Sequence, residues 1–248
     1  MEDRFWNRSP AAFARLGGVL YLAIIAIGAW GEMGLRDKVF VSGDATATAQ
    51  NLKAMESLWR LGLGAEFVLL LLAVSTTWIL WLLLRPVNRD LAWLSIFFNL
   101  VSIALEAGAV LRLAEALFPL GDTAYWNAFL PAQRHILAVL PFRAHTLGFA
   151  ASLIFFGGYC LVVGRLVYQS GFLPKALGVL MALAGVCYLV NSFALFLSPK
   201  LAGVLFPAIL VPSFLGELSL ALWLAVKGVD AAKWRAVAGT AALAPQRS

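Results

Sequence analysis

Charged residues are scarce in this sequence. Asp, Glu, Lys and Arg make up 13% of its 248 residues, whereas hydrophobic residues make up 62% and the mean hydropathy is +0.86. Because a soluble domain carries about 25% charged residues, a water-soluble globular fold is excluded. The net charge of +6 comes from single basic residues between apolar runs. We therefore predict no nucleic-acid partner and assign these residues to loops that set membrane topology.

Cysteine and histidine are also scarce, with two of each. Cys160 and Cys187 lie in apolar runs without the spacing of metal ligands, so we predict buried hydrophobic side chains. A disulfide or a reactive thiol is the alternative. No Glu-x-x-His or His-x-x-x-His pair occurs, and we predict no metal site. The sequence also lacks a Gly-x-Ser-x-Gly motif, a phosphate loop and a dinucleotide fingerprint, so any cofactor is unknown.

Long apolar runs are abundant. A helix of about 20 apolar residues crosses the hydrocarbon core of a bilayer. The qualifying stretches are 14–34, 60–84, 91–116, 145–168, 175–197 and 203–226. Short polar turns between them make successive helices antiparallel neighbours. We therefore predict an all-α polytopic membrane helix bundle with six transmembrane helices in one domain, residues 1–228, followed by a disordered cytoplasmic tail, residues 229–248.

Loop charges predict the orientation of this bundle. Most basic residues lie on the inner side if both termini are cytoplasmic, as the positive-inside rule requires. Segments 36–59 and 119–144 then lie outside, where we expect them to pack together as a helical cap, with breaks at Pro131 and Pro141. The alternative is that 129–143 forms a re-entrant or seventh membrane element. Tryptophans, including Trp59, Trp78, Trp81 and Trp93, fit interfacial aromatic belts.

Ionisable side chains at membrane depth are the candidate functional residues, because inserting each one costs roughly 2.5–3.5 kcal/mol. They persist where they face a partner or a water-filled cavity. The predicted interior has a rim of Glu32, Arg60, Arg112 and Arg143 and a floor of Glu66, Glu106, His145 and Asn191. Glu217 lies deeper, on the last span. All except Glu32 are predicted to bind a ligand, although ion pairs that only fix helix packing would give the same pattern.

Three stretches resemble a known family. They are Gly43 to Gly62, which contains Asn51, Glu56 and Arg60, then Ser170 to Leu180, and Gly216-Glu217-Leu218 followed by Leu222-Trp223-Leu224. These strings are similar to the signature of the bacterial integral-membrane family called domain of unknown function 4386, over about residues 10–228. The resemblance implies a multi-pass protein of the bacterial cytoplasmic (inner) membrane. It implies no activity.

Two functions are open at this point. The first is binding or transport of a small polar or amphiphilic molecule in an outward-opening polar cavity, with membrane lipids and a small amphiphilic ligand as partners. The second is an intramembrane enzyme that uses Glu66, Glu106 or Glu217 as general acid or base on a lipid-like substrate. A structural subunit with mutually satisfied polar residues is a third. An open polar pocket would favour a ligand, and closed ion pairs would argue against one.

Overall fold

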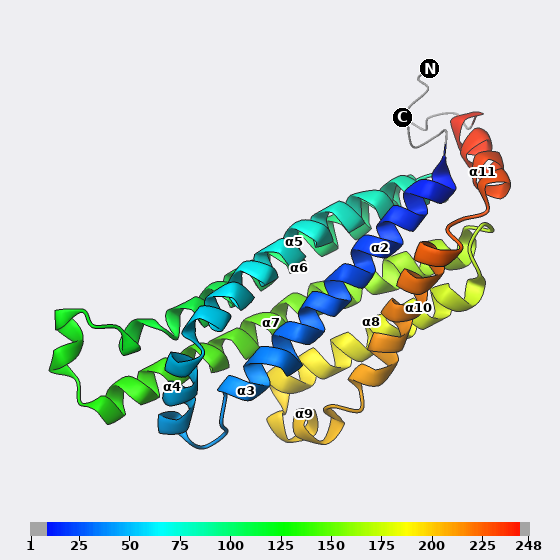
Figure 1. The fold of residues 1–248 in the computed structure, drawn as a ribbon. Helices are drawn as coiled ribbons and strands as arrows, with labels where there is room; N and C mark the ends of the chain where they lie inside the picture. Colours follow the sequence, from blue (N-terminus) through cyan, green and yellow to red (C-terminus); the bar gives the residue numbers. More distant parts are fainter. Residues whose placement is uncertain (1–8, 244–248) are drawn as a thin grey trace. The chain divides into compact units, whose positions relative to one another are not determined.

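Helices make up nearly all of residues 9–243, the part of the chain that the computed structural model describes (Figure 1). Within that part, five helical stretches are long and apolar enough to cross a membrane, and a sixth exists if a bent helix pair counts as one span. The five are Pro10–Val39, Glu56–Leu84, Arg89–Leu120, Pro131–Gln169 and Lys175–Leu197. The bent pair is α9 (Pro199–Leu205) and α10 (Leu210–Val226), at 57°. The predicted polytopic helix bundle is confirmed.

The first stretch comprises three consecutive elements. They are α2 (Pro10–Ala29), the π-helical turn η1 (Trp30–Arg36) and α3 (Asp37–Val39). The other long helices are α5 (Glu56–Leu84), α6 (Arg89–Glu115), α7 (Pro131–Gln169) and α8 (Lys175–Leu197). The short elements are α4 (Ala45–Ala54), the 3-10 turns η2 (Phe118–Leu120) and η3 (Ala124–Ala128), and α11 (Ala231–Leu243).

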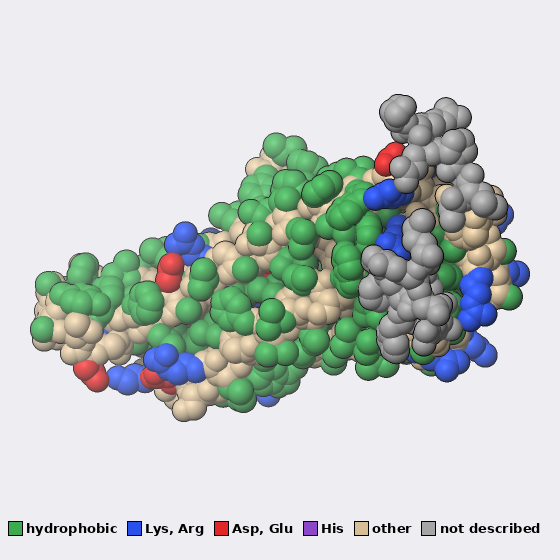
Figure 2. All heavy atoms as spheres, turned by 90° about the horizontal axis from the view of Figure 1, so that it is seen from above, with side chains coloured by type: hydrophobic (Ala, Val, Ile, Leu, Met, Phe, Trp, Pro, Cys, Tyr) green, Lys and Arg blue, Asp and Glu red, His purple; other side chains and the backbone are tan. Residues whose placement is uncertain are grey.

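The chain forms two compact units, and helices α2, α5, α6 and α7 each contribute residues to both. Within the described residues, unit 1 comprises residues 9–23, 72–102 and 153–243, and unit 2 comprises residues 24–71 and 103–152. Large hydrophobic side chains are exposed along the long helices, and hydrophobic side chains cover much of the face drawn in Figure 2. Such a surface is costly in water and suits contact with lipid.

Helices α7 and α8 of unit 1 pack backbone against backbone through glycines. A Cβ on Gly178 would lie 2.6 Å from the carbonyl oxygen of Gly164, and one on Gly185 would lie 2.6 Å from that of Gly157. The seven-residue spacing within each helix puts its two glycines on one face. In the turn between the helices, Gly171 has a φ of +71°, which glycine adopts without strain.

Helix α10 of unit 1 is held equally closely by its neighbours. A Cβ on Gly18 of α2 would collide with the backbone nitrogen of Ala225 on α10. On another side of α10, a Cβ on Gly216 would lie 2.6 Å from the carbonyl oxygen of Leu180 on α8. Glycine is therefore required where α2 and α8 each meet α10.

Helix α11 of unit 1 lies where the sequence predicts a disordered tail. Asp230 caps it, since the carboxylate accepts hydrogen bonds from the backbone N–H groups of Ala232 and Lys233, both at 3.1 Å. The buried indole of Trp234 donates to the carbonyl oxygen of Leu83 at 2.9 Å. Residues 231–243 are thus helical, and residues 244–248 lie outside the described part.

Unit 2 has its own hydrophobic core. Its buried members are Leu35, Val39, Leu52, Trp59, Leu113, Ala116, Leu117 and Phe142. Trp59 is 1% exposed, with its ring centroid 5.3 Å from that of Phe142. Its indole N–H donates to the carbonyl oxygen of Leu113, in the last turn of α6, at 3.2 Å. The assignment of Trp59 to an interfacial belt is therefore wrong, because the carbonyl oxygen of Leu113 satisfies its polar group within the core.

The segments predicted to form a cap are in contact within unit 2. Asp44 caps α4 by accepting a hydrogen bond from the backbone N–H of Ala47 at 2.9 Å, after Gly43 with a φ of +81°. From α4, the Thr46 hydroxyl lies 3.2 Å from Nδ1 of His135 on α7. Residues 36–59 and 119–144 therefore meet, as the sequence predicts.

Helix α7 is a single helix of 39 residues that contains Pro141. At 1.5 Å per residue it is about 58 Å long, whereas the hydrocarbon core is about 30 Å thick. At least one of its ends must therefore extend beyond the hydrocarbon core. Residues 131–143 are the first part of this helix, so the alternative of a separate element at 129–143 is wrong. Pro131 begins the helix, and Pro141 does not break it.

Candidate functional site

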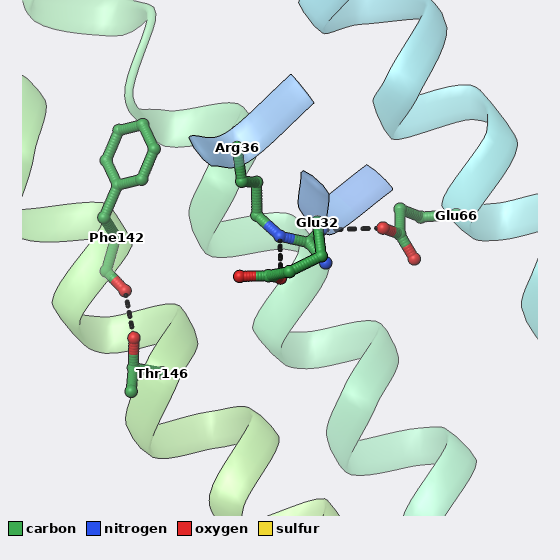
Figure 3. A network of polar contacts seen from close by, with 5 residues as sticks. All are labelled: Glu32, Arg36, Glu66, Phe142 and Thr146. Atoms are coloured by element: carbon green, nitrogen blue, oxygen red, sulfur yellow. Dashed lines mark hydrogen bonds and ion pairs between the residues drawn. The ribbon is translucent and has the colours of Figure 1, made fainter. Parts of the chain in front are cut away.

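Arg36 is the centre of a polar cluster in unit 2. Its Nε lies 2.6 Å from Oε2 of Glu32, one helical turn earlier, and its Nη1 lies 2.7 Å from Oε1 of Glu66 on α5. Figure 3 shows the guanidinium between the two carboxylates. The Glu66 side chain is 8% exposed and that of Arg36 is 16% exposed, so this pair is mostly shielded from the surroundings. A buried carboxylate of this kind requires such a partner.

The π-helical turn η1 positions this cluster. It carries both Glu32 and Arg36, and isolated π-turns in helices are frequent at functional sites. Gly31 in the same turn faces Glu66, because a Cβ there would lie 2.5 Å from the carboxylate oxygen. On α5, Gly62 makes room in the same way for the side chain of Leu35. The two glycines allow η1 and α5 to approach closely enough for the ion pair to form.

The space beside this cluster is small. A cavity of about 10 Å³ is lined by Gly31, Leu35, Arg36, Trp59, Gly62, Leu63, Glu66 and Leu113. That volume holds about one water molecule. Buried His145 stacks on Phe149, with ring centroids 5.9 Å apart and planes 7° apart, and it lies within electrostatic range of Arg36. Glu66 and His145 thus belong to one unit, but the cavity next to Glu66 is too small for an organic ligand.

The other predicted residues of unit 2 lie in different surroundings. Exposed Arg60 pairs with Glu56 at 2.8 Å, and exposed Arg112 pairs with Glu115 at 3.0 Å. Pairs of this kind contribute about 0–1 kcal/mol. Arg143 on α7 is exposed and Glu106 on α6 is half-buried.

Glu217 belongs to unit 1, on α10. Its Oε2 accepts a hydrogen bond from the hydroxyl of Tyr21 on α2 at 2.7 Å, and its Oε1 accepts one from the hydroxyl of Tyr188 on α8. Tyr159 and Cys160 of α7 lie within electrostatic range of the same carboxyl. Asn191, which the sequence places on the pocket floor with Glu66, is half-buried on α8 of unit 1.

Glu66 and Glu217 therefore have separate sets of partners in separate units. Sequence reasoning missed Arg36, although the four-residue spacing from Glu32 is that of a helical ion pair. It also missed Tyr21, a single polar group in a long apolar run. No local pattern connects Tyr21 to Glu217, which lies 196 residues further along the chain.

A larger pocket lies in unit 2 between α4 and the start of α7. It has a volume of about 190 Å³ and is lined by Ala49, Gln50, Lys53, Leu120, Pro131, Arg134 and His135. Three of these side chains are basic, and within residues 9–243 no acidic side chain lines the pocket. In the sequence, Arg134 and His135 stand out only as polar residues of an outer segment.

The basic side chains of this pocket, hereafter the basic pocket, are positioned to donate hydrogen bonds. Arg134 donates from Nε to the carbonyl oxygen of Pro119 at 2.6 Å and from Nη2 to that of Gly121 at 2.7 Å. These bonds use two of its five donors and fix its plane. His135 contacts Thr46 through Nδ1, which leaves Nε2 available. The Lys53 ammonium has no hydrogen-bond or ion-pair partner among the described residues.

Metal ligands do not gather in the described part of the chain. Within residues 9–243, no three His, Cys, Asp or Glu side chains lie together as a metal site requires. Cys160 is buried and Cys187 is partly buried, and both are free thiols.

Comparisons with known proteins place the chain in a family. The model of a family described as "Domain of unknown function (DUF4386)" matches residues 16–228. An "Uncharacterized protein" of Archaeoglobus fulgidus is 28% identical over 162 residues, which are 65% of this chain and 80% of the relative. No solved structure matches the chain.

Proposed function

Since the chain belongs to the DUF4386 family, whose description names no activity, we propose a function from its own geometry: it binds the phosphate group of an anionic amphiphile in the basic pocket. That the chain is a multi-pass membrane protein follows from its helices. The observation that carries the proposal is a pocket of about 190 Å³ lined by Lys53, Arg134 and His135 without an acidic side chain within the described residues.

Electrostatics favour an anion in the basic pocket. Positive side chains that share a pocket repel one another, and an anion between them removes that repulsion. Phosphate suits the donors present, because arginine presents a rigid fork to its oxygens and lysine adds a point charge. Each hydrogen bond to a charged group contributes about 1.5–3 kcal/mol.

The size and lining of the basic pocket favour a headgroup rather than a whole lipid. Ligand pockets for larger organic molecules have volumes of about 300–1,000 Å³, and this one has about 190 Å³. Ala49, Leu120 and Pro131 give it an apolar wall beside the basic groups. Basic pockets of membrane proteins recognise lipid phosphates through the same combination.

The alternative of an intramembrane enzyme has less support. Glu66 is held by Arg36, and the cavity beside it has room for about one water molecule. A general acid or base must reach its substrate directly or through one water.

The location in the bacterial cytoplasmic membrane, which the sequence predicts, is part of this proposal. The relative from Archaeoglobus fulgidus comes from an archaeon and therefore does not support a bacterial membrane in particular.

Binding to the full-length protein in nanodiscs tests the proposal. We expect the protein to unfold at a higher temperature in nanodiscs that contain phosphatidylglycerol in a phosphatidylcholine background than in nanodiscs of phosphatidylcholine alone. The bound phosphate could belong to a soluble ester or to a lipid, and adding glycerol phosphate to discs of phosphatidylcholine distinguishes the two. If glycerol phosphate stabilises the protein, the basic pocket binds a soluble ester. If only phosphatidylglycerol stabilises the protein, the basic pocket binds a lipid. Both results support a phosphate site.

Matched lysine variants provide the control. Lys53→Gln is expected to weaken binding about tenfold or more, because one charged hydrogen bond is lost. Lys200→Gln removes an exposed lysine of α9 that does not line the basic pocket and is expected to leave binding unchanged. Equal effects of the two variants, or no stabilisation by any phosphate compound, would overturn the proposal.

A further inference from the structure

A second polar site, independent of the basic pocket, lies in unit 1. We propose that Glu217, Tyr21 and Tyr188 form a proton-exchange site in which the Glu217 carboxyl takes up one proton from water and releases it to water. Its three oxygen-bearing side chains come from α10, α2 and α8, and each phenol bonds a different carboxyl oxygen. The ligand of this site is the proton itself.

Glu217 has no compensating cation among the residues that the structure describes. Among residues 9–243, no lysine, arginine or histidine forms an ion pair with it. The titratable groups that face it are Tyr21, Tyr188, Tyr159 and Cys160, none of which carries a positive charge. An unpaired charged side chain costs roughly 2.5–3.5 kcal/mol at the centre of a membrane span. The neutral acid is thereby favoured at this position.

Glu66 shows the contrasting arrangement in the same chain. Its carboxylate pairs with the Arg36 guanidinium at 2.7 Å, and arginine remains charged at all ordinary pH values. The Glu66 carboxyl therefore has a fixed cation as its partner. Glu217 has two phenols in place of that cation.

The two phenols are suited to both protonation states of Glu217. A tyrosine hydroxyl both donates and accepts hydrogen bonds. The ionised carboxylate accepts a hydrogen bond from each phenol, whereas the neutral acid donates a hydrogen bond to one phenol oxygen and accepts one from the other. Both arrangements use the same two oxygen–oxygen contacts, so the carboxyl can gain or lose a proton without rearrangement of the helices.

Close packing keeps these oxygens in place. Gly18 brings α2 against α10 three residues before Tyr21, and Gly216 brings α8 against α10 one residue before Glu217. The Tyr188 ring also packs edge-on against Phe156 of α7, with centroids 5.5 Å apart. Rigid support of this kind keeps a reactive group in its working geometry.

Dicyclohexylcarbodiimide, a carbodiimide that enters membranes, tests the site in the full-length protein. A protonated carboxyl adds across a C=N bond of the reagent: the carboxyl oxygen bonds to the carbodiimide carbon and the proton moves to nitrogen. The product rearranges to a stable N-acylurea, and no group leaves. We expect mass spectrometry to find the adduct on Glu217 and not on Glu66, with faster labelling as the pH falls.

Infrared spectroscopy tests the exchange of the proton itself. The wild-type protein is expected to show a carboxylic-acid C=O band that is lost in Glu217→Gln and shifts when D₂O replaces H₂O. Tyr188→Phe, which removes one phenol oxygen and keeps the ring, is expected to move this band. Glu66→Gln is the matched control and leaves it unchanged.

These two experiments distinguish a carboxyl that exchanges its proton from one with a purely structural role. An acid band that persists unshifted in D₂O identifies a locked hydrogen bond and overturns the proposal. Absence of both the band and the adduct, or an adduct on Glu66 alone, also overturns it. If Glu217→Gln does not fold, the D₂O shift and the adduct in the wild-type protein still decide the question.

Discussion

Replacing Arg36 by methionine is expected to lower the free energy of unfolding by about 3–5 kcal/mol, because it leaves a buried charge uncompensated. The guanidinium is held by Glu32 at 2.6 Å and by Glu66 at 2.7 Å, and the Glu66 side chain is 8% exposed. Methionine keeps an unbranched chain that reaches about as far as Nε of arginine, and it removes the charge. Denaturation of the protein in detergent micelles, followed by circular dichroism, measures the loss.

Two further variants show whether the loss comes from the buried pair. Arg60→Met removes an arginine from an exposed pair with Glu56 and is expected to cost about 0–1 kcal/mol. The double variant Arg36→Met with Glu66→Gln removes both charges, and we expect it to recover part of the lost stability. Equal losses for Arg36→Met and Arg60→Met would show that Glu66 does not depend on Arg36.

The Gly178→Ala variant is expected to be destabilised by about 1–3 kcal/mol or more, as overpacking a close interface commonly costs. A Cβ at this position would lie 2.6 Å from the carbonyl oxygen of Gly164 and 2.6 Å from the backbone nitrogen of Tyr168. Neither atom can turn away as a flexible side chain would, so α7 and α8 must separate. Thermal unfolding of the purified protein, followed by the intrinsic fluorescence of its tryptophans, measures the change.

Gly108→Ala is the matched control for this prediction. Gly108 also lies within a long helix, α6, but a Cβ there would meet no atom of another described segment within 4 Å. Alanine there is expected to leave stability unchanged or to raise it by about 0.5–1 kcal/mol, because glycine is the weaker helix former. If both alanine variants behaved alike, the α7–α8 contact would not depend on glycine.

The spans were predictable from the sequence because burial in lipid requires long apolar runs. Lys175–Leu197, for example, has the predicted bounds of the fifth span, and Glu56–Leu84 begins four residues before the predicted second span. The start of α7 was not predictable in the same way. Proline in a helix usually breaks or kinks it, yet Pro141 lies inside this one, where it is buried.

The tertiary partners of polar groups were the least predictable part. A single tryptophan such as Trp59 has the same sequence signal in an interfacial belt and in a core, and only the nearby carbonyl of Leu113 distinguishes them. The helix at 231–243 depends on Asp230 as a cap and on a pocket for Trp234 in unit 1. Such contacts join segments far apart in the chain, so local patterns do not reveal them.

The polar residues of this protein thus serve different purposes. Arg36 and Glu66 form a closed pair that joins η1 to α5, and Glu217 forms a separate centre with two phenols. The basic pocket differs from both in its charge. Among the described residues that line it, none is acidic, whereas Lys53 and Arg134 are basic. That excess of positive charge is the reason for assigning ligand binding to this pocket.

The most direct measurement of that assignment is a high-resolution structure of the protein in nanodiscs that contain phosphatidylglycerol. We expect density for a phosphate group within hydrogen-bond distance of Lys53, Arg134 and His135. Density for water alone in this pocket at saturating phosphatidylglycerol, with lipid phosphates bound elsewhere on the protein, would contradict it.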